Sequence, residues 1–293
     1  MPLPDALREC RLVPGRPIAG PVAALARDLV VHARRQSSGA DSIEAVHQCR
    51  LVLKALRALL CLVPGTEGSR PPARLDAALR ALGRHLSPTR DRDVARATLS
   101  DLVAKRGDPR QRAAANRWLR GLRRDPLPIG SVADAVLGLD RLQASLLRHL
   151  RRAAKPASME SGLARTFRKA RRWHRRAAAT GKPDAFHAWR RWQKRLEAQL
   201  RWTETKPTRG FRSLLDKLQE RQEDLGRLHD LDVLATFLEA SRKASGGAQA
   251  RDAKSLLLLV LDRQRRLQTR LLRDDGGMPL RRIHRAVRRL GKF

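Results

Sequence analysis

The sequence predicts an all-α fold, and three of its features carry this prediction. Strand formers are scarce, since the chain has no Tyr and few Ile or Thr. Hydrophobic residues make up 42% of the chain and recur at the spacing of three and four residues that is typical of helices. Pro, Gly and Asp interrupt this pattern at intervals, as they do at helix ends. This much periodic apolar surface is enough for a sizeable core.

Turn signals divide the chain into two sets of six helices. In the first set, signals such as Pro64-Gly65 and Asp108-Pro109 separate the helices. The predicted ranges of the first set are 18–37, 41–63, 72–86, 89–106, 109–124 and 131–153. A break at Lys155-Pro156-Ala157-Ser158 follows. The predicted ranges of the second set are 160–179, 184–203, 208–226, 229–244, 248–273 and 279–291.

The equal number of helices on the two sides of the break suggests an internal duplication. Segment 46–54 parallels segment 186–194 at an offset of 140 residues, and segment 86–94 parallels segment 225–233 at an offset of 139. Two matches in the same order and with nearly the same offset are hard to obtain by chance. The domain prediction is a single unit over 1–293, with a first helical half at about 17–154 and a second at about 158–293.

Charge is the most unusual property of the chain. It has 63 Lys plus Arg against 29 Asp plus Glu, a net charge of +34, which attracts polyanions. Only eleven of the basic residues are Lys. Arg binds phosphate oxygens two at a time, although a GC-rich genome would also favour Arg over Lys. A disordered basic tail is excluded by the abundance of core-forming residues.

Cysteine usage and the absence of long apolar segments bear on location. Cys10, Cys49 and Cys61 are odd in number and lack metal-ligand spacing, as expected of reduced thiols in a cytosol. The N-terminal residues show no signal-peptide pattern, and the longest apolar run, 256–261, is too short to cross a bilayer. We therefore expect a soluble cytoplasmic protein without a membrane partner.

Basic residues form stripes on single helix faces. The first stripe begins at His47 and spans an arc of roughly 80°, and a second begins at His187. Solvated helix faces usually mix charges of both signs, whereas these positions carry no acid, so an anion is expected to lie on them. The candidate phosphate-binding residues are His47, Arg50, Lys54, Arg57, Arg90, Arg165, Arg168, Arg172, His187, Arg190, Lys194, Arg201 and His229. Trp189 and Trp192 fall on the opposite face and are predicted to be core residues.

Histidines and aspartates in the matched segments allow more than one interpretation. A His beside phosphates would gain positive charge, whereas a metal site is disfavoured because the stripes offer mostly Arg and Lys. A phosphohistidine is conceivable, but no general base is visible beside either His. The paired acids could bind Mg²⁺, but we favour a supporting role behind the Arg and His side chains. These supporting residues are Asp91, Asp93, Asp230 and Asp232. No cofactor and no metal are expected.

Four segments together resemble the CHAD domain, the conserved histidine α-helical domain. They are 46–57, 162–171, 186–196 and 228–233. The resemblance implies two pseudo-symmetric helical bundles that face each other across a basic central channel. It also implies non-catalytic binding of inorganic polyphosphate, often at polyphosphate granules. By the family motif the channel would be lined by His47, Arg50, Lys54, Arg57, His187, Arg190, Lys194 and His229.

The chain departs from the family pattern at three positions. Ala55 replaces a usual basic residue, Phe167 stands where an aromatic hydroxyl is common, and Arg90 replaces a His. No Glu-x-Glu-x-Lys signature of the triphosphate tunnel domain, which many relatives carry, occurs here, so we expect a stand-alone module.

Two other functions compete with polyphosphate binding. A nucleic-acid-binding protein fits the charge equally well, but aromatic residues make up only 3% of the chain, so we expect nucleic acid to bind only non-specifically. A polyphosphatase or phosphotransfer enzyme would need acid clusters for metal ions, which the sequence lacks. We therefore predict a binding protein and not an enzyme.

Overall fold

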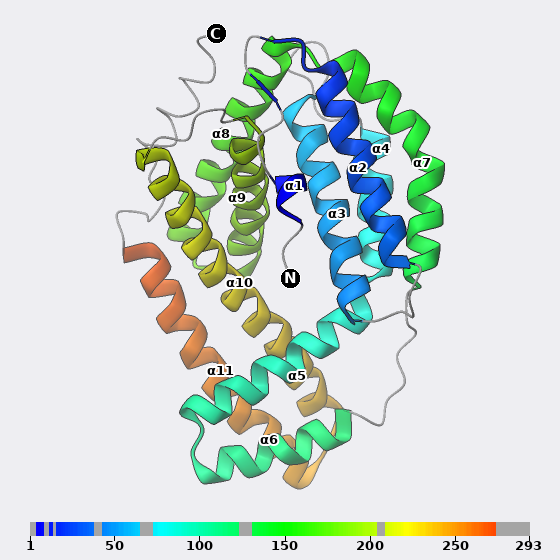
Figure 1. Cartoon of the computed structure of the whole chain (residues 1–293). Helices are drawn as coiled ribbons and strands as arrows, with labels where there is room; N and C mark the ends of the chain where they lie inside the picture. The colour runs from blue at the N-terminus through cyan, green and yellow to red at the C-terminus, as the bar shows by residue number, and fades with distance from the viewer. Residues whose placement is uncertain are drawn as a thin grey trace.

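The computed structural model describes residues 4–8, 12–13, 16–37, 43–64, 73–122, 131–203 and 209–273. Throughout these ranges the only regular structure is α-helix, as predicted (Figure 1). The helices are α1 (Asp5–Arg8), α2 (Ala19–Ser37), α3 (Ile43–Leu62), α4 (Ala73–His85), α5 (Ser87–Arg106), α6 (Pro109–Leu122), α7 (Val132–Ala153), α8 (Pro156–Thr180), α9 (Pro183–Thr203), α10 (Arg209–Ala244) and α11 (Gly247–Arg273). The predicted helix 279–291 lies outside the described residues.

The long helix α10 corrects the sequence prediction of two helices at 208–226 and 229–244. The helix runs unbroken for 36 residues through Gly226, which we expected to end it. Leu225 and Leu228 are each 1% exposed on either side of this glycine, so the buried face continues across it. A helical glycine costs about 1 kcal/mol relative to alanine, which burial of the neighbouring leucines offsets.

Two hydrophobic cores organise the packing. The first contains residues of α1, α2, α3, α4, α7 and α8 together with the end of α9 and the start of α10. The second contains residues of α5, α6 and α11 together with the end of α8, the start of α9 and the rest of α10. Figure 1 shows the same arrangement, with α5 and α6 crossing the lower parts of α10 and α11. The cores therefore do not divide at the break near residue 155, and the internal duplication stays a prediction.

Helices α3, α9 and α10 position the site. Helix α9 packs against α8, α10 and α3. Trp189 on α9 is fully buried, which confirms it as a core residue, and Trp192 is partly buried at the edge of the first core. Gly162 on α8 lies so close to the end of α3 that an added Cβ would be 2.0 Å from the carbonyl oxygen of Leu62. None of the described helices is long and apolar enough to span a bilayer.

Candidate functional site

A pocket of about 540 Å³ opens between α3, α9 and α10, with α1 at one side. Two carboxylates, Glu197 and Glu223, line it, against seven basic side chains. The basic lining residues are Lys54, Arg57, Arg190, Arg191, Lys194, Arg195 and Arg201. The pocket therefore brings together five of the candidates from the stripes on α3 and α9.

Arg190 and Lys194 form the most strongly desolvated part of the basic lining. Burial and then the charge of Arg190 lower the pKa of Lys194 to about 8. Burial also lowers the pKa of Arg190, where Asp230 acts in the opposite direction and Arg50 adds to the lowering. The Nε atom of Arg190 is buried without a hydrogen-bond partner. These cations are held in place by the fold at a cost in desolvation and repulsion.

A pair of histidines lies beside these cations. The Nε2 atom of His187 is 2.6 Å from Oδ2 of Asp232, whose Oδ1 accepts a hydrogen bond of 2.6 Å from Gln264. His229 Nδ1 lies 3.2 Å from the same Nε2 atom of His187, and the two rings meet edge to face. Because a carboxylate oxygen only accepts, His187 Nε2 carries the hydrogen of its contact with Asp232.

The charge of His229 differs from the sequence expectation that a binding-site His is positively charged. The pKa of His229 is lowered to about 3. The largest cause is burial, followed by the charges of Arg190 and His187, and Lys54 and Arg50 have smaller effects. His229 is therefore neutral at physiological pH while no anion offsets these charges. The expected positive charge follows from the attraction of a phosphate alone, whereas burial and the repulsion among the cations act against it.

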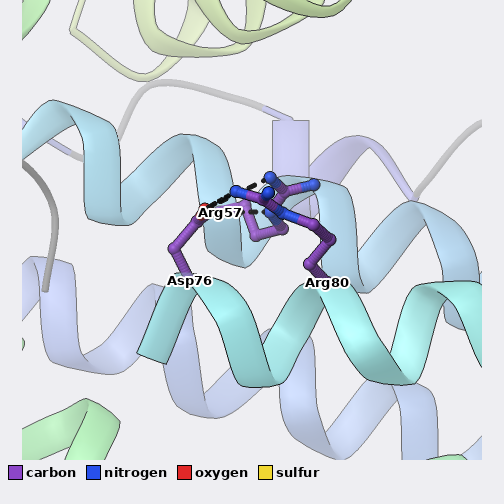
Figure 2. Close-up of polar contacts among 3 residues, drawn as sticks. All are labelled: Arg57, Asp76 and Arg80. Carbon is purple, nitrogen blue, oxygen red and sulfur yellow. Dashed lines mark hydrogen bonds and ion pairs between the residues drawn. The ribbon is translucent and has the colours of Figure 1, made fainter. Parts of the chain in front are cut away.

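The guanidinium of Arg57 forms an ion pair with a carboxylate on another helix, as Figure 2 shows. Its Nε is 2.8 Å from Oδ1 of Asp76 on α4, and its Nη2 is 3.4 Å from Oδ2. Arg80 Nη2 donates to the same Oδ2 over 2.6 Å. Burial alone would raise the pKa of Asp76, but the hydrogen bonds from Arg57 and Arg80 outweigh it and lower the pKa. This carboxylate was not among the predicted site residues.

A second carboxylate, Glu197, pairs with Arg201 at the C-terminal end of the basic stripe on α9. Arg201 Nη2 lies 3.1 Å from Glu197 Oε1, and Gln222 donates a hydrogen bond to Glu197 Oε2. Glu197 stands four residues before Arg201, so this pair was readable from the sequence as an i,i+4 contact.

Comparison with known proteins shows which family has this architecture. The CHAD domain family model matches residues 22–239. The chain belongs to the CHAD domain family. Among solved structures, the crystal structure of the CHAD domain from the plant Ricinus communis matches with a TM-score of 0.59 and 20% sequence identity. The match covers 96% of this chain and 93% of that chain, which shows a common fold. A comparison with curated protein sequences gives no match.

Several other candidate residues of this CHAD domain lie outside the pocket lining. Arg50 donates to the carbonyl oxygen of Leu86 over 3.2 Å and thereby ties α3 to the junction of α4 and α5. His47 is half-buried one turn before Arg50 on α3, and Asp91 and Asp93 are half-buried on α5. The side chain of Arg90 lies outside the described part of the chain.

The predicted site residues on α8, Arg165, Arg168 and Arg172, form a third stripe that does not line this pocket of the CHAD domain. Arg168 and Arg172 are exposed, and neither they nor Arg165 line the pocket, because the opposite face of α8 packs into the cores. Arg191 and Arg195 line the pocket but were not predicted. The sequence offered a signal for them, since they are four residues apart and directly follow Arg190 and Lys194.

The acidic pairs do not form a metal centre with their described neighbours. Within the described ranges, no group of three or more His, Cys, Asp or Glu side chains is arranged to hold a metal ion. Asp232 instead contacts His187 and Gln264. Asp230 acts electrostatically on Arg190 and Lys194.

Proposed function

We propose that this CHAD domain binds inorganic polyphosphate in the pocket between α3, α9 and α10 and leaves it chemically unchanged. The observation that carries the proposal is the convergence of seven cations, from two helices, on a lining with two carboxylates. Like charges held this close repel, so a polyanion that enters gains from every cation at once. The same proposal puts the protein in the cytoplasm at sites where polyphosphate accumulates, such as granules.

The side-chain chemistry favours phosphate groups over nucleobases. Arg offers paired N–H donors that match phosphate oxygens, and Lys adds compact charges between them. Binding of single-stranded nucleic acid usually adds aromatic surfaces on which bases stack. Trp202, the one aromatic residue of the lining, is 2% exposed and donates its indole N–H to the carbonyl oxygen of Leu7. The pocket therefore suits a ligand made of phosphates alone.

Two candidate general bases, Glu197 and His187, are engaged with protein partners. Glu197 accepts hydrogen bonds from Arg201 and Gln222, and His187 contacts Asp232. This supports holding of the polymer rather than its cleavage. Incubation with polyphosphate and Mg²⁺ or Mn²⁺ should release no orthophosphate, and steady release that scales with protein concentration would contradict this part of the proposal.

Isothermal titration with long-chain polyphosphate tests the binding itself. The wild type should bind with submicromolar affinity at low salt. At physiological salt, a variant with Lys54, Arg190, Arg191 and Lys194 changed to Ala should bind about thirtyfold to a thousandfold more weakly than the wild type, because four pocket contacts of about 0.5 to 1 kcal/mol each are lost. Its log–log salt slope should also flatten by roughly 3, at about 0.7 per phosphate contact.

A matched control separates a defined site from general charge. Arg110, Arg120, Lys155 and Lys254 are exposed and lie outside the pocket lining. Changing these four to Ala removes the same two Arg and two Lys, and the affinity should stay within about threefold of the wild type at physiological salt, where exposed charges are screened. An equal loss of affinity in both variants would show that polyphosphate binds through non-specific charge and not at a defined site. Excess single-stranded DNA that displaces polyphosphate at physiological salt would favour the nucleic-acid alternative.

A further inference from the structure

Two of the pocket arginines form ion pairs with carboxylates of the protein, whereas Arg190 and Lys194 form none with the described residues. Arg57 is bound by Asp76, and Arg201 is bound by Glu197. Within the described residues, Arg190 and Lys194 make no ion pair at hydrogen-bond distance. The pocket therefore has two cations on which Asp230 acts only electrostatically, and two arginines that an internal carboxylate already binds directly.

We propose, on the basis of the proposed function, that Asp76 competes with the phosphate chain for the guanidinium of Arg57 and so weakens binding at this position. Arg57 lines the pocket, whereas Asp76 and Arg80 do not. Its guanidinium is therefore placed between two anions, a carboxylate on α4 and whatever anion enters the pocket.

The geometry of the Arg57–Asp76 pair is that of a phosphate contact. Two nitrogens of the guanidinium face the two oxygens of one carboxylate, at 2.8 and 3.4 Å. A phosphate group uses the same paired N–H donors. While the carboxylate occupies the Nε and Nη2 donors, a phosphate can take this pair of donors only by exchange. Figure 2 shows Arg57 reaching from α3 to α4 to make this contact.

The surroundings of Asp76 favour such an exchange. Arg195 acts on the charge of Asp76, and Arg191 experiences the repulsion of Arg57 and Arg80. Three guanidinium groups, those of Arg57, Arg80 and Arg195, thus act on one carboxylate, and Arg191 adds to the positive charge around Arg57. After an exchange, Asp76 would still keep Arg80, which lies four residues further along the same helix and is 55% exposed. The carboxylate therefore does not lose all of its hydrogen bonds when Arg57 turns to a phosphate.

The substitution Asp76→Asn tests the competition in the same titration with polyphosphate. The amide keeps the shape of the side chain but removes its charge, so Arg57 becomes available to the ligand. Binding at physiological salt should tighten about fivefold to tenfold, the order expected for one more charge-assisted contact. The log–log salt slope should steepen by roughly 0.7 to 1.

The chain offers a closely matched control in Asp252. Arg117 donates to its two carboxylate oxygens over 2.7 and 2.9 Å, and this pair joins α6 to α11 outside the pocket lining. Asp252→Asn changes the net charge and breaks a bidentate pair in the same way, and it should alter affinity by less than about twofold at physiological salt. The gain from Asp76→Asn should also disappear in an Arg57→Ala background.

Several results would contradict the proposal that Asp76 and the phosphate chain compete for Arg57. These are unchanged or weaker binding by Asp76→Asn, an equal gain by Asp252→Asn, or a gain that persists without Arg57. If the Asn variant fails to fold, NMR of the arginine Nε–H groups of the wild type decides, since addition of polyphosphate should shift the Arg57 signal and an unmoved signal refutes the exchange. A wild type that does not bind polyphosphate refutes the proposed function. A wild type that binds while Asp76→Asn gains nothing refutes only the role of Asp76.

Discussion

The depressed pKa of Lys194 makes a quantitative prediction about binding above neutral pH. Its pKa is lowered from 10.5 to about 8 by burial and by Arg190, so the free protein loses this charge around pH 8 and lacks most of it between pH 8 and pH 10.5. A bound polyanion offsets both causes and favours the charged form. If binding restores the ordinary pKa, the complex keeps the proton throughout this range, and affinity must fall as the pH rises.

The size of the effect follows from the two pKa values. At pH 7.5 most Lys194 side chains of the free protein are charged, and at pH 9.5 only about 3% are. Taking the ordinary pKa for the complex, the dissociation constant should rise about twentyfold between pH 7.5 and pH 9.5. This corresponds to about 1.8 kcal/mol of binding free energy. Near pH 9, binding should take up close to one proton per complex.

Titration calorimetry in buffers of different ionisation enthalpy measures both quantities. The control is Lys194→Arg, which keeps a charge over the whole range because guanidinium does not titrate there. Its dissociation constant should change by less than about threefold between pH 7.5 and pH 9.5. A wild type that shows no pH dependence, or a Lys194→Arg variant that shows the full dependence, would refute the assignment to this side chain.

Two further predictions concern α8. Arg168→Ala combined with Arg172→Ala should change the affinity for polyphosphate by less than about twofold at physiological salt, because both side chains are exposed outside the pocket lining; a loss comparable to that of the four-residue pocket variant would contradict this. Gly162→Ala should destabilise the fold by more than about 3 kcal/mol in denaturant unfolding, because the new methyl group would collide with the Leu62 carbonyl oxygen, whereas Gly121→Ala, which meets no described atom within 4 Å, should be neutral or slightly stabilising.

The sequence was informative wherever periodicity decides the structure. Helical spacing placed Arg190 and Lys194 on the face of α9 opposite Trp189, and the structure has Trp189 in the core and the two cations in the pocket. The matched segments also identified α3 and α9 as the helices to compare. The packing of these two helices against each other is a tertiary contact, for which periodicity provides no rule.

The remaining differences have separate physical causes. Gly226 was expected to end a helix, but the buried leucines on either side continue the helix through it. The α8 stripe has the same spacing as the other two, yet spacing defines a face and not the direction in which that face points. Asp76 is 19 residues from Arg57 and belongs to another helix. Its contact depends on how α4 is placed against α3, which no local pattern reveals.

Burial and repulsion among the cations together connect features that are unrelated in the sequence. With no anion bound, His229 stays neutral, Lys194 holds its proton less tightly, and Arg57 shares its charge with Asp76. Each of these lowers the positive charge that the pocket must carry alone. A polyphosphate chain would remove the need for all of them, since its own charges offset those of the lining. The same excess of charge that predicts a polyanion partner therefore also predicts that binding is linked to proton uptake and to the exchange of an internal carboxylate.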